Sequence, residues 1–215
     1  MSKLLSEFIG TFLLVCAVVG SGIMATNLTT DVGLQLLINA IATVAALFVL
    51  ISLFAAKSGA HFNPVVTLYV YQQKQISITS ASQYIAVQII GAIGGAKFAE
   101  LMFHESLGGM AQQVRSGIGL LLSEVLATAG LILIISFALK NKINAAVVVP
   151  AWIAAGYFFT ASTIFANPAV TIGRAFTDSF AGIHPNSTFN FILAQLVGLI
   201  IGAGISNLVH KESNV

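Results

Sequence analysis

The chain has 215 residues, of which 57% are hydrophobic and only 7% are charged, and its mean hydropathy is +0.96. Soluble domains carry about 25% charged residues, so the composition excludes a soluble globular protein and indicates an integral membrane protein. The formal net charge of +2 is too small to predict a nucleic-acid partner. The single cysteine, Cys16, excludes an internal disulfide and a cysteine-rich metal site.

Apolar runs predict six membrane spans, because a helix needs about 20 apolar residues to cross the hydrocarbon core. The first span carries Glu7 and has no convincing cleavage site, so we expect it to belong to the mature protein. The expected spans cover residues 4–26, 33–56, 79–102, 118–139, 145–162 and 188–208.

Two shorter helices are predicted between the spans, each starting at an Asn-Pro pair. Asparagine can cap a helix through its side chain, and proline fits the first helical position, where no amide hydrogen is needed. The short helices are expected at about residues 64–71 and 168–176, and neither is long enough to span. We call the two starts the first box, Asn63-Pro64-Val65, and the second box, Asn167-Pro168-Ala169.

The distribution of basic residues predicts the orientation, because cytoplasmic loops carry the excess of lysine and arginine. When six spans are threaded alternately, Arg115, Arg174 and Lys97 fall on one side. The larger group falls on the other side and places both termini in the cytoplasm. That group is Lys3, Lys57, Lys74, Lys140, Lys142 and Lys211.

The two halves of the chain repeat one pattern. Ser-Glu begins the first span and recurs early in the fourth, Gln-x-x-Gly recurs in the third and sixth spans, and the boxes are 104 residues apart. Three spans per half is an odd number, so the second copy is inserted upside down. We therefore predict an all-α membrane protein of six transmembrane helices and two re-entrant half-helices. The inverted repeats cover about residues 4–102 and 118–208 of a single channel domain, residues 1–215.

Irregular backbone at membrane depth is tolerated only where it is buried in protein or lines a water-filled cavity. Two half-helices that meet by their N-termini place two positive dipole ends, each equivalent to about half a charge, at the centre of that cavity. Such a centre repels cations, including a proton. Asn63 and Asn167 add side-chain amide donors there, which predicts a pore for neutral molecules.

These motifs resemble the aquaporin, or major intrinsic protein, family from Glu7 to about Ser206. The resemblance is carried by the two boxes, the Gln-x-x-Gly pairs, and the strings Glu7-Phe-Ile-Gly-Thr11 and Ser58-Gly-Ala-His61-Phe. It implies a homotetramer with one pore per subunit that passes water or small uncharged solutes passively. No cofactor is predicted, and His104, His184 and His210 are too scattered in the sequence to predict a metal site.

Val170 is a departure from the family pattern, in which an arginine follows the second box and forms the outer selectivity filter. Arg174 lies four residues later on the same helix face, about 6 Å further along the axis at ~1.5 Å per residue. Two readings stay open: Arg174 replaces the missing charge from nearer the outer mouth, or it pairs with Asp178. Val65 also stands where the family usually has alanine.

The other filter positions are also unlike those of water-selective members. The second-span position falls near Thr43, and the fifth-span position falls among Tyr157, Phe158, Thr160 and Ala161, of which we favour Ala161. With no histidine there, the filter is predicted to be wide enough for glycerol, urea or metalloid hydroxides such as arsenous acid. The segment after the second box resembles a bacterial branch associated with arsenic handling, which implies the bacterial inner membrane.

Three further polar residues receive structural interpretations. Glu7 and Glu124 are expected to accept hydrogen bonds from the backbone of the re-entrant segment in their own half, although an intramembrane carboxylate also suggests a proton relay. His61 is expected to line the inner vestibule.

Alternatives to a broad neutral-solute channel remain. One is a strictly water-selective channel, and another is an ion-coupled transporter, which also uses inverted repeats but needs ionisable residues at its site. The spans carry no Ser/His/Asp set, paired aspartates or zinc-ligand cluster in sequence, so an enzyme is not predicted.

Overall fold

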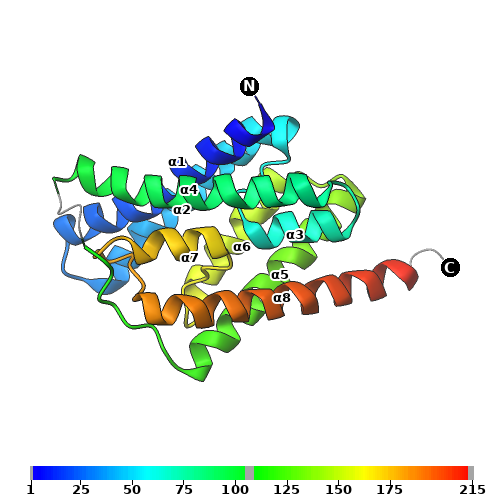
Figure 1. The fold of residues 1–215 in the computed structure, drawn as a ribbon. Helices are drawn as coiled ribbons and strands as arrows, with labels where there is room; N and C mark the ends of the chain where they lie inside the picture. Colours follow the sequence, from blue (N-terminus) through cyan, green and yellow to red (C-terminus); the bar gives the residue numbers. More distant parts are fainter. Residues whose placement is uncertain (1, 105–108, 213–215) are drawn as a thin grey trace.

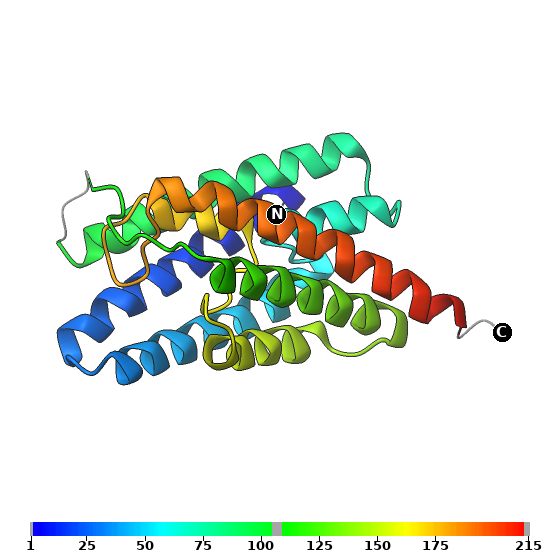
Figure 2. The same cartoon turned by 90° about the horizontal axis from the view of Figure 1, so that it is seen from below.

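The computed structural model describes residues 2–104 and 109–212. These residues form α-helices and connecting segments, and no strand occurs within these two ranges. Figures 1 and 2 show the long helices running roughly along one axis, with the two short helices α3 and α7 lying end to end in the middle. The helices are α1 (Lys3–Leu28), α2 (Val32–Ser58), α3 (Pro64–Gln72), α4 (Ile78–Met102), α5 (Ile118–Asn141), α6 (Ala145–Phe159), α7 (Pro168–Ala175) and α8 (Pro185–Glu212).

Five helices, α1, α2, α4, α5 and α8, are long and apolar enough to cross a membrane. They confirm five of the six predicted spans to within a few residues. The remaining span, expected over residues 145–162, ends earlier, because α6 has 15 residues and measures about 22 Å at ~1.5 Å per residue. The backbone turns extended at Thr160, and the re-entrant segment toward the second box begins there.

Helices α3 and α7 begin where the Asn-Pro pairs predict. The side chain of Asn63 accepts a hydrogen bond from Val65 N, and that of Asn167 accepts from Ala169 N and Val170 N. Each proline occupies the first turn, where its missing N–H costs nothing. Both helices therefore direct their N-terminal ends toward the centre of the molecule.

Each half of the chain is held together by one close helix pair, α1 with α4 in the first half and α5 with α8 in the second. Small residues permit this approach. A Cβ atom on Gly95 would lie 2.2 Å from the carbonyl oxygen of Phe12, and one on Gly202 would lie 2.5 Å from that of Ala129. The backbones therefore touch directly at equivalent places in the two repeats.

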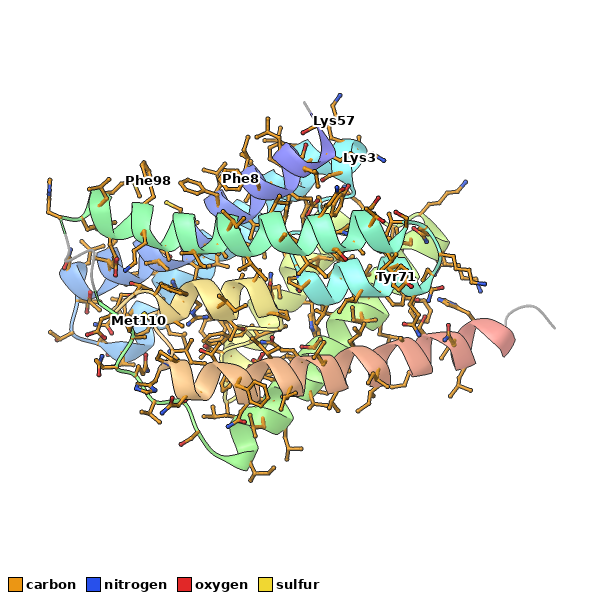
Figure 3. The ribbon with its side chains drawn as sticks, viewed as in Figure 1. Lys3, Phe8, Lys57, Tyr71, Phe98 and Met110 are labelled. Carbon is orange, nitrogen blue, oxygen red and sulfur yellow. The ribbon has the colours of Figure 1, made fainter. Side chains whose placement is uncertain are left out.

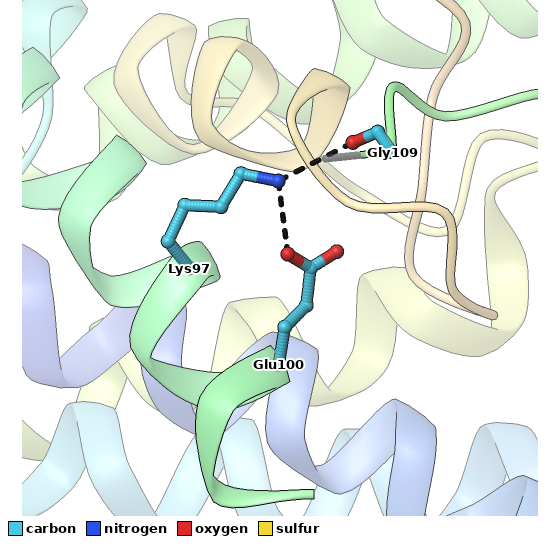
Figure 4. Close-up of polar contacts among 3 residues, drawn as sticks. All are labelled: Lys97, Glu100 and Gly109. Atoms are coloured by element: carbon cyan, nitrogen blue, oxygen red, sulfur yellow. Dashed lines mark hydrogen bonds and ion pairs between the residues drawn. The ribbon is translucent and has the colours of Figure 1, made fainter. Parts of the chain in front are cut away.

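Near the C-terminal end of α4, Lys97 forms an ion pair within the helix and also links the helix to the connection between the halves. Lys97 Nζ lies 2.9 Å from Glu100 Oε2 and donates a second hydrogen bond of 3.3 Å to Gly109 O (Figure 4). Glu100 is buried. Among the side chains described in residues 2–104 and 109–210, this is the one ion pair between oppositely charged groups.

The close contact at Gly95 leads to a stability prediction. Replacement of Gly95 by alanine forces the α1 and α4 backbones apart, and overpacking of this kind costs about 1–3 kcal/mol. Thermal unfolding of the purified protein in detergent should show a lower midpoint. The matched control is Gly204→Ala in α8, where a Cβ meets no atom within 4 Å; equal midpoints for the two variants would contradict the packing argument.

Candidate pore

A cavity of about 280 Å³ passes between the two boxes. Both halves of the chain contribute to its wall, which combines apolar side chains of the long helices with polar groups of the re-entrant segments. The predicted site residues on the wall are Thr43, His61, Asn63, Asn167, Val170 and Arg174. The cavity thus joins residues that lie more than a hundred positions apart in the sequence.

Each of the two asparagines donates a hydrogen bond to a backbone carbonyl in the opposite half of the chain. Asn63 Nδ2 donates to Ala166 O and Asn167 Nδ2 donates to Phe62 O, both at 2.8 Å. A side-chain amide has two N–H donors, and each of these amides uses only one on the described residues. The second N–H of each asparagine is therefore available to a molecule in the cavity.

The backbone before each box takes the same unusual course. Left-handed φ values occur at Gly59, Ala60 and Phe62 and recur 104 residues later at Thr163, Ile164 and Ala166. Non-glycine residues pay for this conformation in free energy, so the surrounding contacts must hold it in place.

Glu7 and Glu124 supply those contacts. Glu7 accepts hydrogen bonds from His61 N at 3.0 Å and Phe62 N at 2.8 Å. Glu124 accepts from Phe165 N and Ala166 N, both at 2.9 Å. These are the backbone hydrogen bonds that the sequence predicts for the two carboxylates, and both side chains are fully buried.

Two glutamines complete the arrangement, and the sequence marks them only as part of the repeat. Gln88 Nε2 bridges Glu7 Oε2 at 2.8 Å and Thr67 Oγ1 at 3.0 Å. The equivalent bridge of Gln195 Nε2 reaches Glu124 Oε2 at 2.7 Å and Thr171 Oγ1 at 2.9 Å. Each glutamine therefore ties a carboxylate to the half-helix that follows the box.

His61 lies on the cavity wall, next to the first box. Its Nδ1 is 3.1 Å from Thr67 Oγ1, and its ring meets that of Tyr84 edge to face with centroids 5.3 Å apart. The side chain is thus held by groups of its own half.

The structure brings Thr43 and Val170 to the cavity but not Ala161. Ala161 is exposed and absent from the cavity wall, and its N–H donates to Ser123 Oγ at 3.1 Å. Tyr157, the first of the four residues considered for the fifth span, is not on the cavity wall either, but it contacts Thr43. Its hydroxyl lies 3.1 Å from Thr43 Oγ1 and 3.2 Å from Asn39 Oδ1.

Arg174 lies on the cavity wall, and it does not pair with Asp178. The Asp178 carboxylate instead accepts a hydrogen bond from Gln112 N at 3.1 Å. Arg174 Nε donates to Ala181 O, and its Cζ lies 3.5 Å from the centroid of the Phe165 ring. Its two Nη groups have no hydrogen-bond partner among the described residues.

The arrangement of two half-helices, joined by their N-terminal ends at a cavity inside an inverted repeat, defines a membrane channel. Residues 1–166 match the family described as Major intrinsic protein. The chain is 43% identical to the Aquaglyceroporin AqpS of Rhizobium meliloti (strain 1021), over 92% of this chain and 85% of that protein. This protein belongs to the major intrinsic protein family.

Other relatives agree with this assignment. A Probable aquaporin TIP-type of Medicago truncatula is 31% identical over 96% of this chain and 84% of its own length. The X-ray structure of the aquaglyceroporin from Plasmodium falciparum matches with a TM-score of 0.73 at 20% identity, covering 95% of this chain and 93% of that one. The last likeness establishes the shared fold.

The carboxylate contacts lead to a prediction about Glu124. In Glu124→Gln, one of the two backbone N–H groups loses its acceptor and faces an amide NH₂, which costs about 1–3 kcal/mol. Thermal unfolding in detergent should show lower stability, and water flux per inserted protein should fall with it. Asp31→Asn is the matched acid-to-amide control, because Asp31 caps α2 and asparagine caps equally well. Wild-type stability of Glu124→Gln would mean that the carboxylate does not hold the second re-entrant segment.

Proposed function

We propose that this protein is a passive channel for water and for small uncharged solutes larger than water, such as glycerol, urea and arsenous acid. The observation that carries the proposal is the cavity at which Asn63 and Asn167 each keep one N–H donor free. Membership of the major intrinsic protein family and the similarity to a protein named as an aquaglyceroporin support it.

The cavity suits neutral molecules because its wall has two kinds of surface. Aliphatic side chains such as Leu14, Val18 and Leu47 form one part, and the asparagine amides form another. A polyol or a metalloid hydroxide can place its hydroxyl groups against the donors while its remaining surface faces the aliphatic part. A cation finds two positive helix ends there and no carboxylate among the described residues of the cavity wall, so its lost hydration is not replaced.

The filter is inferred to consist of Thr43, Val170 and Arg174. Helical side chains lean toward the N-terminus of their helix, and α7 has its N-terminus at the centre of the molecule. The Arg174 side chain therefore points back along α7 toward the level of Val170, where its guanidinium reaches Phe165. The result is a charge at the edge of a constriction that Val170 leaves wider than an arginine would.

The proposed setting is a homotetramer in the bacterial inner membrane with both termini in the cytoplasm. Large apolar side chains on the outer faces of the helices, such as Ile118 at 74% and Ile200 at 71% exposure, fit contact with lipid or with other subunits. Lys3 and Lys57 lie close together at the upper edge of the molecule, away from Met110 at its left side (Figure 3), and this separation fits the orientation inferred from the positive charges.

Stopped-flow measurements on proteoliposomes test the proposal. Water, glycerol, urea and arsenous acid should all enter faster than into empty liposomes, with no dependence on a pH gradient. Complete exclusion of every solute except water would establish the strictly water-selective alternative. Uphill accumulation of a solute driven by a pH gradient would establish the ion-coupled transporter.

The same panel tests the filter through Val170→Arg. The added guanidinium narrows the constriction, so glycerol and arsenous acid flux should fall about tenfold relative to water, which corresponds to about 1.4 kcal/mol. Val170→Leu is the control for added volume without charge. If Val170→Arg reduces all fluxes equally, position 170 does not form the filter.

A further inference from the structure

The two halves of the chain are joined by an outer connection, residues 109–117, that is bonded along the segment after α7. Backbone hydrogen bonds run from Ala111 N to Ala175 O at 3.0 Å and from His184 N to Gln113 O at 2.8 Å. Arg115 N donates to Ser187 Oγ at 3.1 Å. This connection therefore lies beside the outer end of α7, where Arg174 is located.

The side chain of Arg115 is held within this region by oxygen atoms that carry no full charge. Its Nε donates to Gly182 O at 3.0 Å, and its Nη2 donates to Gln113 Oε1 at 2.9 Å and to Phe180 O at 3.5 Å. Burial lowers the pKa of Arg115 to about 10, although Glu124 and Tyr157 raise it in part. The guanidinium remains protonated at neutral pH.

Arg115 shares an aromatic ring with Arg174. The Cζ atoms of Arg174 and Arg115 lie 3.5 Å and 5.3 Å from the centroid of Phe165, both within the roughly 6 Å of a cation–π contact. The ring is buried and meets Phe191 edge to face at 5.1 Å. Arg115 and Phe191 thus support the ring on which the Arg174 guanidinium lies.

Arg115 also supports the second contact of Arg174. The carbonyls that accept its hydrogen bonds belong to Phe180 and Gly182, which flank Ala181 in the chain. Ala181 O is the acceptor for Arg174 Nε. The Arg174 guanidinium therefore contacts the Phe165 ring and Ala181 O, and Arg115 contacts that ring and both neighbours of Ala181.

We propose that Arg115 is a specificity-determining positioning residue, which fixes Phe165 and the loop around Ala181 and so holds the Arg174 guanidinium at the outer mouth of the pore. This inference rests on the proposed function, in which Arg174 is part of the filter. A merely structural role would make Arg115 matter for folding and leave the ratio of solute to water permeability unchanged.

The test measures that ratio in proteoliposomes for wild type, Arg115→Gln, Arg174→Gln and the double variant. With Arg115→Gln, the guanidinium of Arg174 becomes mobile, and the ratio of glycerol to water permeability should rise about two- to fivefold, the range of one cation–π contact of ordinary strength. The change should vanish when Arg115→Gln is added to Arg174→Gln, because residues that act through one another are not additive. Val114→Ala is the control on the same connection, since Val114 is 65% exposed.

Arg115→Lys covers the case in which Arg115→Gln does not fold. Lysine keeps the charge but lacks the planar fork that reaches two carbonyls at once, so a raised ratio is again expected. A wild-type ratio in the folded Arg115 variants overturns the inference, and so does a full effect of Arg115→Gln in the Arg174→Gln background. If wild-type protein passes no solute beyond the level of empty liposomes, the proposed function fails first.

Discussion

The structure depends on two buried carboxylates that satisfy backbone N–H groups in the middle of a membrane. A re-entrant segment leaves amides without helical partners, and water is absent from the hydrocarbon to replace them. Glu7 and Glu124 each accept from two consecutive amides. Because each unmet group costs about 1–3 kcal/mol, the left-handed backbone before each box is stable only while its carboxylate is in place.

The geometry of the pore centre follows from these hydrogen bonds to Glu7 and Glu124. Once Phe62 and Ala166 are held by their N–H groups, their carbonyls become the acceptors for the asparagine of the opposite half. Each asparagine then has one donor used and one free. The two halves are thereby bonded to each other at the point proposed for contact with a solute, so the fold and the proposed function share one set of hydrogen bonds.

Local chemistry made much of this predictable from sequence. Asparagine followed by proline specifies a helix start wherever it lies, so Asn63 and Asn167 marked α3 and α7 correctly. Apolar length gave the spans to within a few residues, and α6 ends at Phe159 rather than at the predicted residue 162. The helix ends before Thr160, where a segment begins whose course is set by Glu124 on another helix. Nothing in the apolar run itself indicates this end.

The residues that sequence reasoning missed are those positioned by distant partners. Ala161 is favoured among four candidates in the fifth span, yet it lies outside the cavity wall beyond the end of α6, and Tyr157 contacts Thr43. Nothing in the sequence distinguishes Phe165 from the other apolar residues around it. Its contact with Arg174 and Arg115 joins three separate segments, which spacing along one segment cannot reveal.

Arg174 lies one helical turn beyond Val170, and the direction of its long side chain can offset that displacement. Moving the arginine from 170 to 174 shifts its Cα about 6 Å outward at ~1.5 Å per residue, and the backward lean of a long helical side chain compensates much of this. In the proposed filter, the Arg174 guanidinium acts at the cavity wall from the end of an extended side chain. A guanidinium held in that way depends on what lies beneath and beside it, so the proposed selectivity depends on Phe165, Ala181 and the connection that supports them.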